Sequence, residues 1–228
     1  YGLPLVGTVL RRVEVVDGRP GRVRTSLLWR HVRRRGTEIV RVGRHFAVAL
    51  PDSLIDLARW SGVMAGVAAM DAALHNRLCS VEAMEEALER LPATARGGPR
   101  ARQAVRLADG RSESPGESMS RVRMWEHRLP KPELQVSVRV GQELYILDYY
   151  WPDHEVAGEF DGRVKYRSAS FGQDPEDVVW REKLREDALR ASGLTVARWT
   201  WAQAWGDAGT QMLRRLAAAG VRPIGRRW

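Results

Sequence analysis

Hydrophobic and polar positions follow different rhythms along the chain, and three stretches can be told apart. Residues 1–51 carry short runs of β-branched residues between glycines, a pattern typical of strands joined by turns. These predicted strands are Val9–Val16, Val23–Leu28, Glu38–Val42 and His45–Ala49. Residues 52–110 instead place apolar residues at helical spacing. The predicted helices are Pro51–Trp60, Val63–Leu78, Val81–Leu91 and a short one that ends at Ala108.

The third stretch, residues 111–228, combines both rhythms. It follows the turn-rich segment Asp109-Gly-Arg-Ser-Glu-Ser-Pro-Gly116, the clearest boundary signal in the chain. The order of predicted elements is helix, three strands, helix, strand and helix. They are Pro115–His127, Leu134–Val140, Glu143–Trp151, Val156–Asp161, a helix from Asp174 to Gly193, Thr195–Trp201 and Gln203–Ala219. This order predicts an α/β fold with a mixed central sheet flanked by helices, behind a β-rich segment and a helical segment.

Carboxylates interrupt the predicted strands of this third stretch. Asp148 lies in phase with Leu144 and Ile146, and a charge on an apolar strand face is costly unless a cation meets it. Glu159 and Asp161 are two residues apart in the next strand, so their side chains share one face. Acidic groups gathered in this way repel one another, and a divalent cation relieves the repulsion. The sequence therefore predicts a metal site held by Asp148 and Glu159.

Each acidic candidate also has a structural interpretation. Asp148 could end a strand or pair with an arginine, and Glu159 could lie exposed on an edge strand. Asp161-Gly162 is an ordinary turn signal. Glu117 follows Ser114-Pro-Gly in a pattern that fits a capping box, although a carboxylate at a helix start can also point towards an adjacent sheet.

Lysine is rare in a chain that is rich in arginine. Of 37 basic residues only Lys131, Lys165 and Lys183 are lysines. A lysine offers a compact point charge where an arginine offers a planar fork. Lys165 and Lys183 follow the acidic residues, so either is a candidate to offset negative charge in a transition state or to align water. With so few lysines, coincidence is the alternative.

The net charge of +9 is concentrated near the start of the chain. Residues 1–50 contain 11 arginines against the three carboxylates Glu14, Asp17 and Glu38. Such a basic segment indicates a nucleic-acid partner, and double-stranded DNA is expected. Arg33, Arg34 and Arg35 are the candidate phosphate contacts, in a loop or short helix over Arg30–Arg35. A solvated basic surface without a ligand is the alternative.

Composition excludes several classes of protein. A hydrophobic content of 44% and a charged content of 29% are typical of soluble globular proteins. The longest apolar run, Val63–Met70, is too short to span a membrane, and Arg11 and Arg12 interrupt the apolar start, so no signal peptide is expected. Cys79 is the only cysteine, which excludes an internal disulfide and a structural zinc held by cysteines. A cytoplasmic setting is expected.

Several motifs together resemble one enzyme superfamily. Ser114-Pro-Gly-Glu117, Asp148, Glu159-Phe-Asp-Gly-Arg-Val-Lys165 and Arg181-Glu-Lys-Leu-Arg-Glu-Asp187 are similar to motifs of the PD-(D/E)XK nucleases. The most similar branch is the very-short-patch-repair-like endonuclease domain of actinobacterial AbiEi-antitoxin-like proteins. The resemblance implies a restriction-endonuclease-like fold and hydrolysis of phosphodiester bonds in DNA with Mg²⁺ or Mn²⁺.

The resemblance also assigns roles. Asp148 matches the first aspartate of the motif, Glu159 the acidic residue of the second strand and Glu117 the helix carboxylate. Asp161 stands where the motif has a lysine, so Lys165 or Lys183 would have to take that place, and Glu117 and Asp161 would assist from the rim.

The missing lysine leaves a second function open, a non-catalytic DNA-binding, antitoxin-like regulator that keeps the nuclease fold. A weaker third hypothesis is a protein-interaction module that uses tryptophans. These are Trp151, Trp180, Trp199, Trp201 and Trp205.

Overall fold

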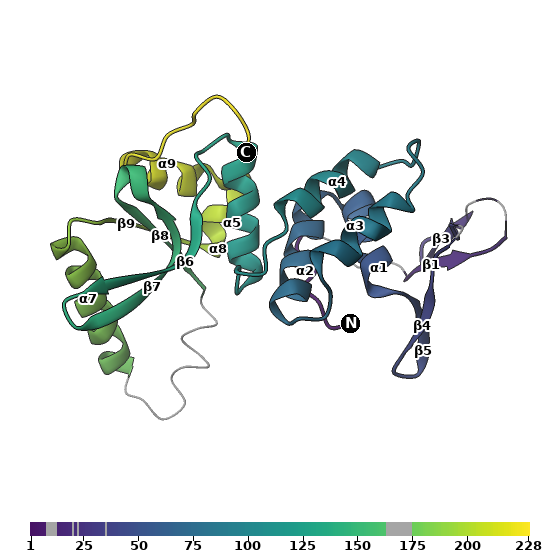
Figure 1. Cartoon of the computed structure of the whole chain (residues 1–228), viewed down its shortest axis with the longest axis horizontal. Coiled ribbons are helices and arrows are strands. Elements are labelled where there is room, and N and C mark those ends of the chain that lie inside the picture. The colour runs from purple at the N-terminus through teal and green to yellow at the C-terminus, as the bar shows by residue number, and fades with distance from the viewer. Residues whose placement is uncertain (8–12, 20, 22, 35, 163–174) are drawn as a thin grey trace. The chain divides into compact units, whose positions relative to one another are not determined.

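The computed structural model describes residues 1–7, 13–19, 21, 23–34, 36–162 and 175–228, apart from the side chains of residues 175–179 and 182. The chain divides into two compact units, Tyr1–Pro115 (unit 1) and Gly116–Trp228 (unit 2). The ribbon in Figure 1 is coloured by residue number from the N-terminus to the C-terminus. The division falls at the end of the turn-rich segment Asp109–Gly116. Each unit is described here by itself.

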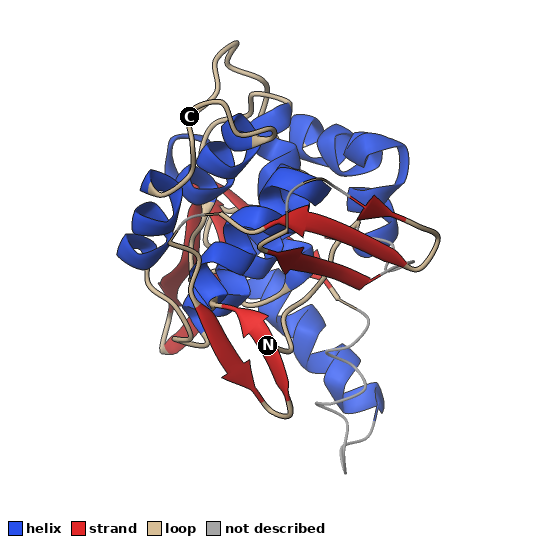
Figure 2. Cartoon of the chain, turned by 90° about the vertical axis from the view of Figure 1, so that its right-hand side faces the viewer, coloured by secondary structure: helices blue, strands red, loops and turns tan. Residues whose placement is uncertain are grey.

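Unit 1 begins with two small sheets (Figure 2). Strand β3 lies between β1, which is parallel to it, and β2, which is antiparallel. The strands β4 and β5 form a separate antiparallel hairpin that turns at Gly43, where φ is +58°. The bounds are β1 Val13–Asp17, β2 Val23–Arg24, β3 Leu28–Val32, β4 Ile39–Val42 and β5 His45–Val48.

Two expectations for this segment were wrong. The predicted strand Val23–Leu28 is interrupted, because Thr25 Oγ1 accepts hydrogen bonds from the backbone N–H groups of Leu27 and Leu28 and turns the chain there. The loop or short helix predicted over Arg30–Arg35 does not begin at Arg30, because Arg30 to Val32 belong to strand β3. Residues 8–12 of the predicted first strand lie outside the described residues.

Four helices complete unit 1, close to where the periodicity predicts them. They are α1 Leu50–Ser61, α2 Val63–His75, α3 Val81–Glu89 and α4 Gly98–Leu107. Helix α2 is alanine-rich and buried along most of its length, as expected for a central helix. Gly66 allows its close approach to α1, because a Cβ atom there would lie 2.5 Å from Ala58 Cβ. Helix α3 begins at Ser80, whose Oγ accepts from Ala83 N at 3.2 Å.

Unit 2 is built around a four-stranded sheet with the order β6-β7-β8-β9. Strands β6, β7 and β8 are antiparallel neighbours, whereas β9 is parallel to β8 and follows it after α7. The strands are β6 Glu133–Val140, β7 Glu143–Trp151, β8 Val156–Asp161 and β9 Thr195–Thr200; β7 and β8 are joined by a short 3-10 turn, η1 Pro152–His154. This sheet confirms the predicted mixed α/β class.

Helices cover both faces of the sheet (Figure 1). On one face Tyr149 Oη donates to the Glu117 carbonyl at 2.7 Å and Trp199 Nε1 donates to Ser120 Oγ at 2.8 Å, which packs α5 against the sheet. On the other face Leu189 of α7 meets a buried cluster that includes Leu147. The helices are α5 Pro115–Glu126, α7 Pro175–Ala191, α8 Trp201–Trp205 and α9 Thr210–Ala218.

The last predicted helix, Gln203–Ala219, is divided in two. Asp207 and Ala208 have φ of +46° and +50° within η2 Gly206–Gly209, which separates α8 from α9. Thr200 and Gln203 form a capping box that starts α8 two residues earlier than expected. A lipid bilayer could not be crossed by any helix in the described part of the chain.

Candidate functional site

Asp148 lies where strand β7 changes the face that it presents. In a regular strand, residues 147 and 149 would point to the same face. Here Leu147 packs on the α7 side, while Tyr149 hydrogen-bonds to α5 on the other side. Leu144 and Ile146 are 55% and 53% exposed, so the predicted apolar row in phase with Asp148 was wrong. Asp148 itself is buried, between two neighbours that face opposite ways.

Gln135 of β6 lies opposite this distortion. The ladder pairs Leu134 with Tyr149 and Val136 with Leu147, which leaves Gln135 facing the position of Asp148. Gln135 has φ of +52°, a left-handed conformation that is costly for any residue other than glycine. Its side-chain Nε2 donates to Glu117 Oε2 at 3.1 Å. The strained backbone therefore brings an amide to a buried carboxylate.

Sequence reasoning missed Gln135. In the alternating strand it occupies a polar position beside Leu134 and Val136, and such a position is normally exposed. The residue types around Gln135 do not predict its left-handed backbone conformation. The one available signal was that Gln135 lies in the sequence between Glu117, the predicted helix carboxylate, and Asp148, the predicted strand carboxylate.

Glu117 is positioned by the first turn of α5. Its residue is only 1% exposed, and the charges of Glu117 and Asp148 both raise the pKa of the fully buried Tyr149, after the larger effect of burial itself. Gly116 lets this turn sit against the sheet, because a Cβ atom there would lie 2.0 Å from Phe160 Cζ. Through Gln135, the Glu117 carboxylate meets β6 of the sheet, as one of the two interpretations of the sequence anticipated.

Asp148 and Glu159, here called the carboxylate pair, come from the adjacent antiparallel strands β7 and β8. Asp148 Oδ2 accepts from the Phe160 backbone N–H at 2.8 Å, which ties the aspartate to β8. Glu159 is 8% exposed, and its Oε1 accepts from Arg185 Nη2 at 2.8 Å. Burial raises the pKa of Glu159 from its ordinary 4.5 to about 7, the Asp148 charge adds to the rise, and Arg185 opposes it. Two buried acidic groups thus lie close enough for the charge of one to raise the pKa of the other.

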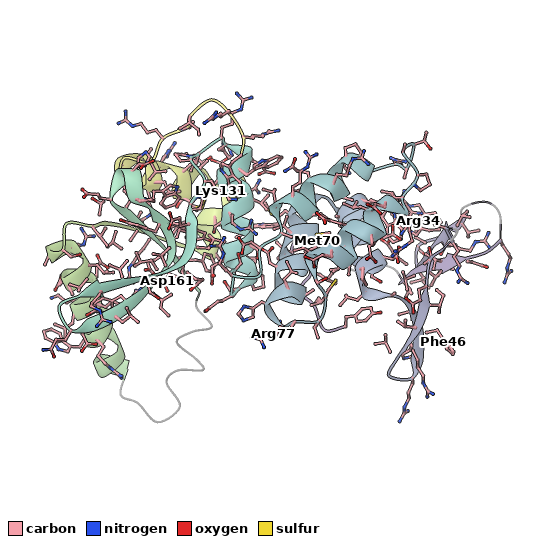
Figure 3. All side chains as sticks on the ribbon, viewed as in Figure 1. Arg34, Phe46, Met70, Arg77, Lys131 and Asp161 are labelled. Atoms are coloured by element: carbon pink, nitrogen blue, oxygen red, sulfur yellow. The ribbon has the colours of Figure 1, made fainter. Side chains whose placement is uncertain are left out.

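The remaining acidic and lysine candidates are less closely integrated. Asp161 is partly exposed at the end of β8, two residues beyond Glu159 (Figure 3). Lys183 is exposed on α7, with its Nζ 5.7 Å from the centre of the Trp180 ring. Lys165 lies outside the described residues.

The three candidate phosphate contacts have different surroundings. Arg33 is exposed and donates from Nη2 to the Thr37 carbonyl at 2.9 Å. Arg34 is largely buried and forms ion pairs with Asp52, at 3.0 Å, and with Asp56 (Figure 3). Arg35 lies outside the described residues. Arg34 therefore has a structural partner within unit 1, whereas Arg33 presents its charge to solvent.

The donors at the carboxylate pair suit a hard divalent cation. Within the described part of the chain, no three histidine, cysteine, aspartate or glutamate side chains converge closely enough to hold one ion. Mg²⁺ is commonly bound by one or two carboxylates together with substrate phosphate and water. Two oxygen ligands that repel each other, as the raised pKa of Glu159 records, fit that requirement.

Two curated proteins are similar to this chain. It is 32% identical over 198 residues to the uncharacterized protein Rv2248 of Mycobacterium tuberculosis strain ATCC 25618 / H37Rv. The uncharacterized protein MT2308 of strain CDC 1551 / Oshkosh matches to the same extent. Each alignment covers 86% of this chain and 69% of the relative. No family model matches the chain, and no solved structure matches it.

Proposed function

We propose that this chain, which belongs to the family of the Mycobacterium tuberculosis proteins Rv2248 and MT2308, hydrolyses phosphodiester bonds in DNA at its carboxylate pair. The observation that carries the proposal is the burial of Asp148 and Glu159 side by side on adjacent strands, with the pKa of Glu159 raised to about 7. Such a pair is costly to stability, because each buried carboxylate raises the cost of ionising the other. Perturbed acidic groups of this kind are typical of functional sites.

Asp148 and Glu159 would hold a Mg²⁺ or Mn²⁺ ion. When bound, the ion supplies Lewis-acid polarisation of a phosphate oxygen and lowers the pKa of a water molecule. The chain's own residues orient this site. The break in side-chain alternation in β7 and the hydrogen bond from the Phe160 N–H fix the direction of the Asp148 carboxylate. The hydrogen bond from Arg185 fixes the direction of the Glu159 carboxylate.

Glu117 and Gln135 are hydrogen-bonded to each other on the α5 side of the sheet. A carboxylate and an amide placed together can accept from and donate to a water molecule, so we assign them the positioning of water or of a phosphate oxygen. The arrangement of unit 2, with three antiparallel strands, one parallel strand and helices on both faces, supports the restriction-endonuclease-like fold that the resemblance implies.

The test is cleavage of plasmid, single-stranded and mismatched DNA in Mg²⁺, Mn²⁺ or EDTA. We expect cleavage with either ion and none with EDTA. Asp148→Asn and Glu159→Gln should each lower the rate by at least about a hundredfold, since they keep shape and remove charge. Glu143→Gln is the matched control, because Glu143 is an exposed carboxylate at the start of the same strand β7. Equal rates for all variants would contradict the proposal.

A second function is favoured by one observation, the guanidinium of Arg185 bound to Glu159. A cation supplied by the protein itself can compensate the carboxylate pair without a metal. In that case unit 2 would be a non-catalytic DNA-binding regulator that keeps the fold. DNA binding without cleavage under every metal condition, together with no heat of binding for Mg²⁺ or Mn²⁺ in calorimetry, would identify this function.

A further inference from the structure

Unit 1 contains a cavity of about 800 Å³ whose wall is dominated by arginine. It lies between the first small sheet, helix α1 and the segment that leads into α4, and we call it the arginine cavity. A single carboxylate, Asp56, stands among its described lining residues. The arginines are Arg33, Arg34, Arg59, Arg90, Arg96 and Arg100. This charge distribution calls for an anion.

Three of these arginines form a fixed wall. Asp52, which is 1% exposed, accepts from Arg34 at 3.0 Å and from Arg90 at 2.8 Å. Asp56 pairs with Arg34 and, at 2.5 Å, with Arg59. These pairs hold the guanidinium groups in place before any ligand arrives, so a ligand would not have to order them.

The other arginines carry charge that no carboxylate balances. Among the described residues, Arg33, Arg96 and Arg100 have no ion-pair partner, and all three are exposed. The Nε atom of Arg34 is buried and has no hydrogen-bond partner in the described part of the chain. Arginine forks match phosphate oxygens in geometry and charge. An orphaned guanidinium N–H beside three uncompensated arginines therefore indicates a phosphate group.

Aromatic rings line the same cavity. The His31 ring stacks on the Trp60 ring, with centres 3.6 Å apart and planes 4° apart, and Trp29 lies 4.6 Å from His31 on a tilted plane. All three residues belong to the cavity wall. Stacked aromatic side chains beside cations are a common platform for nucleobases. A ligand with a planar ring and a phosphate group would contact the aromatic rings with its ring and the arginines with its phosphate.

We propose that the arginine cavity binds a nucleotide unit, with its phosphate on the arginines and its base against Trp29 or Trp60. The ligand is either a free mononucleotide or one nucleotide of a single strand. The proposal uses no residue of unit 2, so it stands apart from the proposed hydrolysis. It also gives the basic start of the chain a partner that differs from the duplex backbone expected from the sequence.

The experiment is titration of the full chain, followed by tryptophan fluorescence and calorimetry. The probes are inorganic phosphate, adenosine, adenosine monophosphate and a short single-stranded DNA. Adenosine monophosphate should bind at least about tenfold more tightly than phosphate or adenosine alone, because only it engages both the arginines and the rings. Tighter binding of the oligonucleotide would identify a single strand as the source, and tighter binding of the mononucleotide would identify a small molecule.

Variants separate this site from general basic charge. Arg96→Gln combined with Arg100→Gln should weaken binding of the monophosphate by about tenfold or more. Arg106→Gln is the matched control, because Arg106 is exposed on the same helix as Arg100 and does not line the cavity. Glu143→Gln, at an exposed position of unit 2, should bind as the wild type does. Equal weakening by Arg106→Gln, or no binding of adenosine monophosphate, would overturn the proposal.

Discussion

Both units bury pairs of carboxylates, and they differ in the cations beside them. In unit 1, Asp52 and Asp56 are held by three arginines from three different segments, with charge-assisted hydrogen bonds to each. The result is an excess of positive charge that ties the strand segment to α1 and α3. Such a network stabilises one arrangement of the unit, and its surplus charge faces a cavity.

In unit 2, Asp148 accepts from the Phe160 backbone N–H and Glu159 accepts from Arg185. Burial and the Asp148 charge raise the pKa of Glu159 to about 7 against the opposing charges of Arg185 and Arg198. Buried carboxylates are thus held by an arginine network in unit 1, whereas in unit 2 burial and a second carboxylate raise the pKa of Glu159. The comparison teaches that burial together with the arrangement of nearby charges distinguishes an anion-binding wall from a candidate cation-binding site.

The largest effect is expected in unit 1. Asp52→Asn removes the partner that Arg34 and Arg90 share, and breaking a buried ion pair typically costs about 3–5 kcal/mol. The unfolding of unit 1 in urea should therefore shift to lower concentration by a corresponding amount. Glu85→Gln, an exposed carboxylate on α3, is the control and should stay within about 0.5 kcal/mol of the wild type. A loss below about 1 kcal/mol for Asp52→Asn would mean that the network is not structural.

The second effect concerns pH and unit 2. Glu159 has a pKa near 7 in the folded chain and near 4.5 when unfolded, so the unfolded state ionises first as pH rises. The contribution of Glu159 to stability is therefore greatest below pH 4.5, falls between about pH 4.5 and 7, and is level above. The total loss should approach about 3 kcal/mol, at about 1.4 kcal/mol per pKa unit. Melting curves in EDTA from pH 5 to pH 8 measure it, compared with Glu159→Gln.

In Glu159→Gln this pH dependence should disappear, and above pH 7 the variant should be more stable than the wild type. A wild-type profile that is parallel to that of Glu159→Gln would contradict the raised pKa of Glu159.

The smallest effect separates two cations of helix α7. Arg185→Gln removes the group that lowers the pKa of Glu159, so the pH midpoint of that stability loss should move upward, with a change of about 1 kcal/mol near pH 8. Lys183→Gln, two residues away and exposed, should leave both the midpoint and the stability unchanged within about 0.5 kcal/mol. Equal shifts from both variants would indicate a diffuse charge effect.

Local patterns predicted the elements better than their ends. Alternation in Leu134–Val140 and the helical spacing in Pro51–Trp60 and Val81–Leu91 marked elements that the structure has. The interruption of the strand at Thr25 and the division of the last helix at Asp207 were not predicted. Each depends on a side-chain hydrogen bond or a backbone angle that competes locally with the regular element. Periodicity carries no information about that competition.

The acidic residues of the candidate site could be predicted, because the signal that marks them lies in their own sequence neighbours. Asp148 and Glu159 could be selected because acidic residues in apolar surroundings are costly, and Glu117 because it stands at a predicted helix start. The partners could not be selected. Arg185 lies 26 residues from Glu159, and Gln135 lies 18 residues from Glu117. One of many arginines and an ordinary-looking glutamine acquire their roles only when the sheet closes.

The hairpin between β7 and β8 has a further consequence, which concerns the order in which the chain folds. Asp148 and the Phe160 amide are 12 residues apart, whereas Arg185 reaches Glu159 across 26 residues and Trp199 reaches Ser120 across 79. Closing a shorter loop costs less chain entropy, and parallel pairing such as that of β8 with β9 waits for a longer one. We therefore expect the two acids to come close before their guanidinium arrives, so that α7 closes over a carboxylate pair that is already in place.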